Sequence, residues 1–278
     1  MPVLDRDIIN ILHTQAKNIR TSIITMLAEA GSGHTAGALG MADIFTVLFF
    51  SGLMKHDPKK PSWMDRDRLV LSNGHICPVY YATLAHAGYF PVEELKTLRK
   101  FGARLQGHPH REFFPFTETS SGPLGEGLSQ TVGMALAERI DNENSQKKIF
   151  CLMSDGELQE GQSWEAAMLA GKEKLHNLIA IVDFNNIQIS GNVSDVMPLE
   201  PLADKWRAWN WNVINIDGND FFAIAEAVKK AKDHTGAPTV ILARTVPGKG
   251  VQEWEGKFEW HGKPPTKEEA KKALEVLK

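Results

Sequence analysis

The second half of the chain alternates short apolar runs with segments of helical spacing, and this alternation constrains the fold most. The run IFCLM at 149–153 is continuous and apolar, as is typical of a strand buried on both faces of a parallel sheet. Strands joined by helices form right-handed crossovers, which predicts an α/β fold with a doubly wound, mainly parallel sheet flanked by helices. Further strands are predicted at 178–184, 213–216 and 239–244, and helices at 162–173, 201–209 and 220–233.

The first half is predicted to be mainly helical, with one long irregular segment. That segment, residues 102–127, is longer than an ordinary connection, and long loops of this kind commonly bind ligands. We expect one domain over residues 1–278, ending in a lysine-rich helix at about 266–278. The remaining expected elements are helices at 5–30, 41–54, 78–87, 92–100 and 128–140 and a strand at 68–72.

Charge and cysteine content exclude several classes of protein. The chain has 31 basic and 34 acidic residues, a net charge of −3, and no basic stripe of the kind that nucleic-acid binding requires. Its two cysteines, Cys77 and Cys151, make no disulfide framework, which favours a reducing compartment. No apolar run reaches the roughly 18 residues that span a bilayer. We therefore expect a cytoplasmic protein that binds neither membrane nor nucleic acid.

An acidic turn follows the strand at 149–153. Ser154, Asp155, Gly156 and Glu157 fall at its carboxyl end, the edge where ligands bind in open α/β sheets. A lone Asp-Gly pair is more often an ordinary turn, so the interpretation needs further residues. They occur about thirty residues later, where the strand at 178–184 runs into DFNNIQISG.

If these two strands are neighbours, three oxygen donors converge at one edge. They are the Asp155 carboxylate, the Asn185 amide and the Ile187 carbonyl. Mg²⁺ accepts such ligands and completes its shell with phosphate oxygens. Gly156 would let the backbone approach a phosphate closely, and the helix that follows adds its dipole. The sequence therefore predicts a metal site that holds a diphosphate.

Seven short segments along the chain, taken together, indicate its relatives. They are GSGH at 31–34, DPKKPSWMDRDRLVLSNGH at 57–75, LQGHP at 105–109, SGPLGEGLS at 121–129, SDGELQEGQSWEA at 154–166, DFNNIQISG at 183–191 and HGKPP at 261–265. In this order they resemble transketolases, which depend on thiamine diphosphate. Because the chain is less than half a full transketolase, it resembles the N-terminal, diphosphate-binding subunit of a split transketolase. A C-terminal subunit would supply the pyrimidine-binding half, with the glutamate that activates the cofactor and the arginines that grip the sugar phosphate.

The resemblance implies roles for four histidines. His75 and His261 match histidines that contact the diphosphate and the reaction centre, and His34 and His108 match those that orient substrate hydroxyls and move protons. The alternative for any single histidine is a structural role in the core or on the surface. We assign that role to the other six, which are His13, His56, His86, His110, His176 and His234.

The resemblance also implies cofactor and interface roles. Asp155, Asn185 and the Ile187 carbonyl match ligands of Mg²⁺ or of another divalent cation such as Ca²⁺ or Mn²⁺. Gly156 matches a backbone donor to the diphosphate.

Two further pairs complete the implied site. Gly122 and Leu124 match the pair that receives the aminopyrimidine and packs beneath the rings. Glu160 and Glu165 match acidic residues that link paired sites across the dimer, with Glu160 near the cofactor; a solvated helix face is the alternative.

Two departures from the family pattern bear on the substrate. The chain has GHTAG where GHPGG is usual and GPLGEG where GPLGQG is usual, so Thr35 and Glu126 leave the donor sugar open.

The expected activity is transfer of a two-carbon ketol unit from a ketose phosphate to an aldose phosphate, as in the pentose phosphate pathway. One alternative is an enzyme half resembling 1-deoxyxylulose-5-phosphate synthase, and another is a non-catalytic cofactor-binding assembly protein. Phe113, Phe114 and Phe116 suggest an apolar rim for association. The expected assemblies are a homodimer or, with the partner, a two-plus-two heterotetramer.

Overall fold

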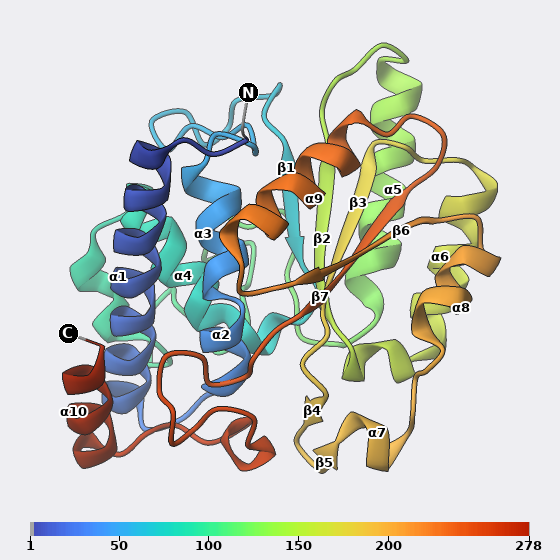
Figure 1. Ribbon diagram of the computed structural model, residues 1–278. Helices are drawn as coiled ribbons and strands as arrows, with labels where there is room; N and C mark the ends of the chain where they lie inside the picture. Colours follow the sequence, from blue (N-terminus) through green and yellow to red (C-terminus); the bar gives the residue numbers. More distant parts are fainter. Residues whose placement is uncertain (1–2, 278) are drawn as a thin grey trace.

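A five-stranded parallel sheet forms the centre of the computed structural model, which describes residues 3–277 (Figure 1). The strand order is β1-β2-β3-β7-β6, and β2 runs beside β3 in register from Ile149 opposite Leu178 to Ser154 opposite Asp183. The doubly wound, mainly parallel sheet predicted from the sequence is confirmed. The strands of this sheet are β1 Arg68–Leu71, β2 Ile149–Ser154, β3 Leu178–Asp183, β6 Asn212–Asp217 and β7 Thr239–Arg244.

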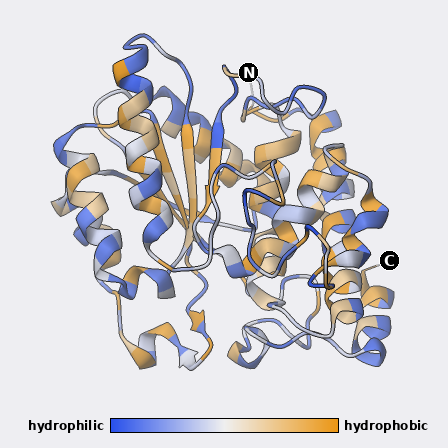
Figure 2. Cartoon of the chain, turned by 180° about the vertical axis from the view of Figure 1, so that it is seen from behind, coloured by the Kyte–Doolittle hydropathy of each residue, from blue (hydrophilic) through white to orange (hydrophobic). Residues whose placement is uncertain are grey.

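The three central strands, β2, β3 and β7, are almost wholly buried, because helices cover both faces of the sheet. Alternate residues of β2 enter two separate cores, with Phe150 and Leu152 in one and Cys151 and Met153 in the other. Figure 2 shows the strands as hydrophobic along most of their length. The first core includes the helices α1 Arg6–Ala30, α3 Ala42–Phe50, α4 Cys77–His86 and α9 Phe221–Asp233, and the second includes α5 Glu126–Asp141, α6 Gly161–Lys172 and α8 Leu202–Ala208.

The first and last helices of the described chain, α1 and α10 (Lys267–Val276), lie side by side. The N-cap of α1, Asp5, accepts a hydrogen bond from the Ile8 N–H at 2.8 Å, and Gly31 ends the helix with a left-handed φ of 64°. The predicted C-terminal helix is α10, Lys267–Val276, which packs against α1 (Figure 1). Thr266 and Glu269 form a capping box at its start.

Three local expectations were wrong or incomplete. The helix predicted at 41–54 is the shorter α3, which ends at Phe50, and the separate helix α2 Ala36–Gly40 before Met41 was not predicted. The helix predicted at 92–100 is a 3₁₀ segment, η2 Val92–Thr97, since Arg99 takes a left-handed φ of 59°. A small hairpin after β3, made of β4 Ile187–Gln188 and β5 Gly191–Asn192, was not predicted. The short helix that follows it in the sequence, α7 Val193–Val196, was not predicted either.

Three further 3₁₀ segments complete the fold: η1 Gly74–Ile76, η3 Gly156–Gln159 and η4 Phe258–Trp260. Both cysteines are buried free thiols, in agreement with the prediction that they make no disulfide framework. Across residues 3–277, no helix is long and apolar enough to cross a membrane.

Candidate active site

The carboxyl ends of β2 and β3 bring the predicted metal donors together. Asp155 follows β2, and its Oδ2 accepts a hydrogen bond from the Asn186 N–H at 2.6 Å. Asn186 has a left-handed φ of 60°, which bends the chain directly after β3. Within the bend, the Asn185 Oδ1 accepts from the Ile187 N–H at 2.9 Å. The predicted carboxylate, after β2, is therefore hydrogen-bonded to the bend after β3 that carries the predicted amide and carbonyl.

Two buried carboxylates give this edge an electrostatic character suited to a cation. Burial raises the pKa of Asp155 to about 7, even though backbone N–H groups stabilise its charge. Burial likewise raises the pKa of Asp183 to about 7, and the nearby Asp155 charge adds to the effect. The Asn185 Nδ2 donates to Asp183 Oδ2 at 2.7 Å, which fixes the orientation of the amide.

The chemistry of this donor set fits Mg²⁺ and a diphosphate. The described residues contain no cluster of three or more His, Cys, Asp or Glu side chains able to hold a metal. The predicted set differs in kind, since it has one carboxylate, one amide and one backbone carbonyl, and Mg²⁺ takes its remaining oxygens from water and phosphate. Such a set holds a metal effectively only when the phosphate is present.

Gly156 lies where a ligand has room to approach. A Cβ built there would meet only ordinary contacts, the nearest 3.5 Å away on Gln188, so the protein's own packing does not require glycine. Its N–H donates to Asp155 Oδ1 at 2.8 Å. The backbone donor predicted for the diphosphate thus contacts the predicted metal ligand directly.

Three of the four predicted histidines form one cluster, and one of them, His75, lies in η1 just after the carboxyl end of β1. The ring centroids are 5.0 Å apart for His34 and His75, 5.2 Å for His75 and His261, and 5.5 Å for His34 and His261. The three residues come from segments that are distant in the sequence. Burial is the main cause that lowers the pKa of His34 and of His261 to about 4 each. It also lowers the pKa of His75 well below its usual value. The cluster is therefore neutral at pH 7, so its rings can both accept and donate hydrogen bonds.

His108 lies beside the predicted glycine-rich loop. A Cβ built on Gly122 would be 3.9 Å from His108 Cγ, and burial lowers the pKa of His108 as well. Leu124, from the same loop, keeps more than a third of its side chain exposed. The predicted loop and the predicted histidine are thus neighbours, with an apolar side chain exposed on the same loop.

Several buried polar atoms at this edge have no hydrogen-bond partner within the chain, which points to a site for a polar ligand. Buried polar groups are nearly always paired in proteins, so a concentration of unpaired ones marks a binding site. They include the Nδ1 atoms of His34 and His261, both polar atoms of the Asn73 side chain, and the Ser121 hydroxyl. Because these residues lie together near the carboxyl end of β1, they fit a ligand rich in hydrogen-bonding oxygens.

Glu157 is a site residue whose role sequence reasoning missed. Its side chain is fully buried, and its Oε1 accepts from the Gly125 N–H at 2.8 Å and from the Ser72 hydroxyl. Its Oε2 accepts from the Ser154 N–H at 3.1 Å. One carboxylate therefore ties the ends of β1 and β2 to the glycine-rich loop. An acidic residue directly after Asp-Gly at a strand end was the available signal.

The predicted interface residues remain on the surface. Glu160 and Glu165 are exposed at the start of α6, and Met168 and Leu169 of the same helix are each about 40% exposed. The exposed face of α6 is therefore partly acidic and partly apolar.

The predicted phenylalanine rim is wrong in part. Phe114 is completely buried and Phe116 is half-buried, because both pack in an aromatic cluster with Phe90, leaving only Phe113 exposed.

The two departures from the family pattern occupy different environments. Thr35 is fully buried, and its hydroxyl donates to the Lys263 carbonyl at 2.6 Å, which joins the start of α2 to the turn after His261. Glu126 is exposed at the first position of α5, where its charge favours the helix dipole. Thr35 therefore affects the site by positioning the His261 segment.

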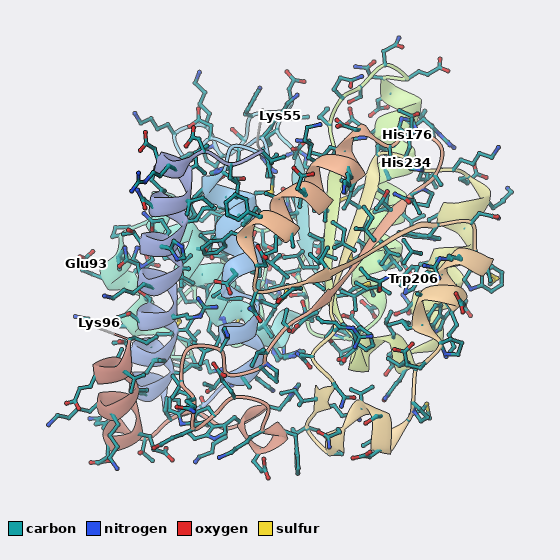
Figure 3. The ribbon with its side chains drawn as sticks, viewed as in Figure 1. Lys55, Glu93, Lys96, His176, Trp206 and His234 are labelled. Atoms are coloured by element: carbon teal, nitrogen blue, oxygen red, sulfur yellow. The ribbon has the colours of Figure 1, made fainter. Side chains whose placement is uncertain are left out.

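The other histidines lie outside the cluster. His56 bonds to the Phe49 carbonyl at 2.8 Å, and His86 to the Ser22 hydroxyl at 2.9 Å. His176 and His234 precede β3 and β7, at the opposite edge of the sheet from the site (Figure 3). His13 packs against Phe221 and His110 against Phe113.

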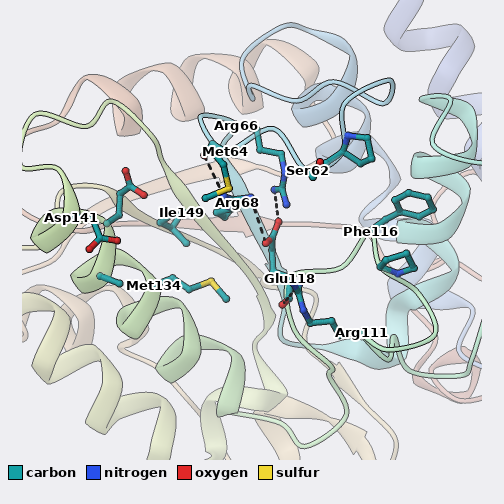
Figure 4. Close-up of a pocket in the computed structure, with 14 residues that line it drawn as sticks. Ser62, Met64, Arg66, Arg68, Arg111, Phe116, Glu118, Met134, Asp141 and Ile149 are labelled. Carbon is teal, nitrogen blue, oxygen red and sulfur yellow. Dashed lines mark hydrogen bonds and ion pairs between the residues drawn. The ribbon is translucent and has the colours of Figure 1, made fainter.

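A second cleft, of about 580 Å³, lies at the amino ends of β1 and β2 and contains none of the predicted site residues (Figure 4). It carries equal numbers of positive and negative side chains, and its central carboxylate, Glu118, pairs with Arg66. The cleft therefore offers no net attraction to an anionic ligand. Its charged lining residues are Arg66, Arg68, Arg111, Glu118, Glu138 and Asp141.

Comparison with known proteins identifies the relatives of the chain. Residues 11–277 match the family model for the thiamine diphosphate binding domain of transketolase. The chain is 44% identical over 266 residues to the 6-deoxy-6-sulfo-D-fructose transketolase subunit SqwG of Clostridium sp. (strain MSTE9), with 96% of each chain covered. It is 38% identical to an apulose-4-phosphate transketolase subunit of Actinobacillus succinogenes, again over 96% of each. The transketolase structure from Campylobacter jejuni shares 37% identity and a TM-score of 0.88, covering 99% of this chain and 43% of that one.

Proposed function

The chain belongs to the transketolase family of thiamine diphosphate-binding domains, and from that premise we propose that it works as a subunit whose site a separate pyrimidine-binding chain completes. It is the thiamine diphosphate-binding half of a transferase of the transketolase type. The observation that carries the proposal is the set of unpaired polar atoms around the histidine cluster, which fits a polar ligand from outside this chain.

We propose that Asp155, Asn185 and the Ile187 carbonyl hold Mg²⁺, or Ca²⁺ or Mn²⁺ in its place, and through it the diphosphate. Gly156 and Asn185 border the diphosphate position, and Asp183 holds the Asn185 amide in orientation. When bound, thiamine diphosphate supplies the thiazolium carbon that carries the two-carbon unit between sugars.

The histidines would then bind and move protons. His75 and His261 border the diphosphate and the reaction centre, while His34 and His108 orient the hydroxyls of the sugars. Because burial keeps the pKa of these imidazoles low, they meet substrate as neutral groups that can accept a proton from a hydroxyl. Exclusion of water by the partner chain would lower their exposure further.

Gly122 and Leu124 would receive the rings of the cofactor, and Glu160 and Glu165 would lie near the axis of a two-plus-two heterotetramer. Their positions support this assignment, since Leu124 is exposed on the loop beside His108 and both glutamates lie exposed at the start of α6.

Ketol transfer between sugar phosphates is the activity we propose. Two relatives carry the names of different donors, a sulfo-sugar for the Clostridium protein and apulose 4-phosphate for the Actinobacillus protein. The printed names of both include transketolase, which favours this reaction over the condensation of pyruvate with an aldose phosphate.

The test is to mix the chain with its pyrimidine-binding partner, Mg²⁺ and thiamine diphosphate and to measure ketol transfer. Donors in parallel reactions are a ketose phosphate, 6-deoxy-6-sulfo-D-fructose and apulose 4-phosphate, with one aldose phosphate as acceptor. We expect transfer only from the mixture. Transfer by the chain alone, or pyruvate consumption in place of transfer, would contradict the proposal.

A further inference from the structure

Arg99 lies against the backbone of two turns of the candidate site. A Cβ built on Gly107 would be 2.6 Å from its Cζ and 2.8 Å from its Nε, so the guanidinium fills the space that a side chain would occupy. A Cβ built on Gly33 would be 3.6 Å from the same Nε. The Arg99 Nη2 also points toward the Gly107 carbonyl, at 3.5 Å.

Each of these glycines directly precedes a histidine of the site. Gly33 leads into His34 and Gly107 into His108, the two residues assigned to hydroxyl orientation and proton movement. The backbone of Arg99 is held for this contact, because its N–H donates to the Leu105 carbonyl at 2.8 Å and its φ is left-handed. A side chain on one segment thus contacts both histidine-bearing turns.

The guanidinium of Arg99 has no acidic partner in the described part of the chain. Between residues 3 and 277, no carboxylate lies within ion-pair distance of its guanidinium. The adjacent Lys100, in contrast, pairs with Glu29 at 3.0 Å. The other charged or titratable groups that act on His34 are His108 and His261, with His75 in ring contact, and none of these is an acid.

We propose that Arg99 is a positioning residue whose guanidinium supports both glycine-histidine turns and places a fixed positive charge behind His34 and His108. This charge opposes protonation of the two imidazoles. It therefore extends to lower pH the range over which they act as proton acceptors. The catalytic meaning rests on the proposed function, whereas the effect on the imidazoles can be measured in the chain alone.

The direction of the pKa shifts supports this placement. Burial lowers the pKa of His108 first, and Arg99 is the charged group that lowers it further. For His34, burial, His261 and Arg99 all act in the same direction. Removal of the Arg99 charge must therefore raise both pKa values.

The test is histidine titration by NMR in Arg99→Gln, with Lys100→Gln as the matched control. Both variants remove one positive charge from neighbouring positions, but Lys100 is paired with Glu29. Chains labelled in histidine are titrated without cofactor, and the His34 and His108 signals are identified by their loss in His34→Asn and His108→Asn. Arg99→Lys keeps the charge and should restore the wild-type titration.

We expect the His108 pKa to rise in Arg99→Gln by at least about three times the change in Lys100→Gln, because Coulomb energy falls with distance. Equal shifts in the two variants, or none in Arg99→Gln, would overturn the proposal. Should Arg99→Gln fail to fold, Gly107→Ala displaces the guanidinium by steric contact and should raise the pKa likewise; an unchanged pKa there overturns the proposal.

A kinetic arm separates positioning from substrate binding. With partner and cofactor, the acid limb of kcat/KM should move to higher pH in Arg99→Gln and stay in place in Lys100→Gln and Arg99→Lys. A higher KM with an unmoved acid limb would show that Arg99 grips substrate instead. If the wild-type mixture shows no ketol transfer, the proposed function fails while the NMR result still decides the role of Arg99.

Discussion

Acidification should destabilise this chain through its histidine cluster, by an amount that two residues allow us to work out. His34 and His261 have pKa values lowered from 6.5 to about 4 in the folded state. Between pH 6.5 and 4, the unfolded chain binds protons at these positions and the folded chain does not. The two histidines therefore take almost nothing from the free energy of unfolding above pH 6.5. They lower it progressively as the pH falls from 6.5 toward 4.

The size of the loss in free energy of unfolding follows from the interval between the assay pH and the unfolded pKa. At pH 5.5, one unit below the unfolded pKa, each histidine costs about 1.4 kcal/mol, and the two together cost about 2.7 kcal/mol. Asp155 and Asp183 act with the opposite sign, since their pKa is raised to about 7 and proton uptake by the folded state stabilises it as pH falls from 7 toward 4. The wild-type stability alone would therefore mix two opposing effects.

The contribution of the histidines is isolated by comparing the pH dependence of unfolding in the wild type and in histidine variants. Urea unfolding at pH 7.5 and 5.5 is measured for the wild type, for His34→Asn/His261→Asn and for His34→Asn alone. The aspartate contribution cancels in the comparison, so the wild type should lose about 2.7 kcal/mol more than the double variant and about half that more than the single one. Equal losses, within about 0.5 kcal/mol, would refute the reasoning.

Three further predictions concern the cofactor, Glu157 and assembly. Asp155→Ala and Asn185→Ala should each abolish retention of thiamine diphosphate with Mg²⁺ in calorimetry while leaving the circular dichroism unchanged; full affinity in either variant would place the metal elsewhere, and EDTA should reproduce the loss. Glu157→Gln cannot accept hydrogen bonds from Ser72, Gly125 and Ser154 together, so it should cost about 2 kcal/mol and lower Tm by about 5 °C, and an unchanged Tm counts against its linking role. Light scattering should show a two-plus-two heterotetramer with the partner, Mg²⁺ and thiamine diphosphate, and a persistent monomer would rule this assembly out.

The sheet was predictable from the sequence because its signals are local. A continuous apolar run such as 149–153 and the strand-helix alternation after it depend on spacing that any reader of the chain can measure. The separate helix α2 before Met41 and the left-handed φ of Arg99 were not predictable, because tertiary packing decides them. The prediction of an exposed phenylalanine rim was wrong in part for the same reason. Whether Phe114 is exposed depends on its contact with Phe90, which lies 24 residues away in the sequence.

The residues of the candidate site also differ in whether the sequence could predict them. Residues with a motif around them, such as Asp155 and His75, could be proposed as site residues from the sequence, because the motif carries its own context. Glu157 and Arg99 could not, since each acts by contacting segments far away in the chain. Residues that bind a ligand leave a pattern in sequence, whereas residues that hold those residues in place are visible only in three dimensions.

The electrostatics of the site explain why the chain would depend on what it binds. Asp155 and Asp183 are buried side by side with pKa values raised to about 7, so at neutral pH their negative charge costs free energy unless a cation offsets it. A divalent cation removes this cost by pairing with the charge, and the diphosphate then completes the shell of the cation. The neutral histidines above contribute no charge to this balance. The metal and the diphosphate should therefore bind with strong mutual dependence, each much more weakly alone than together.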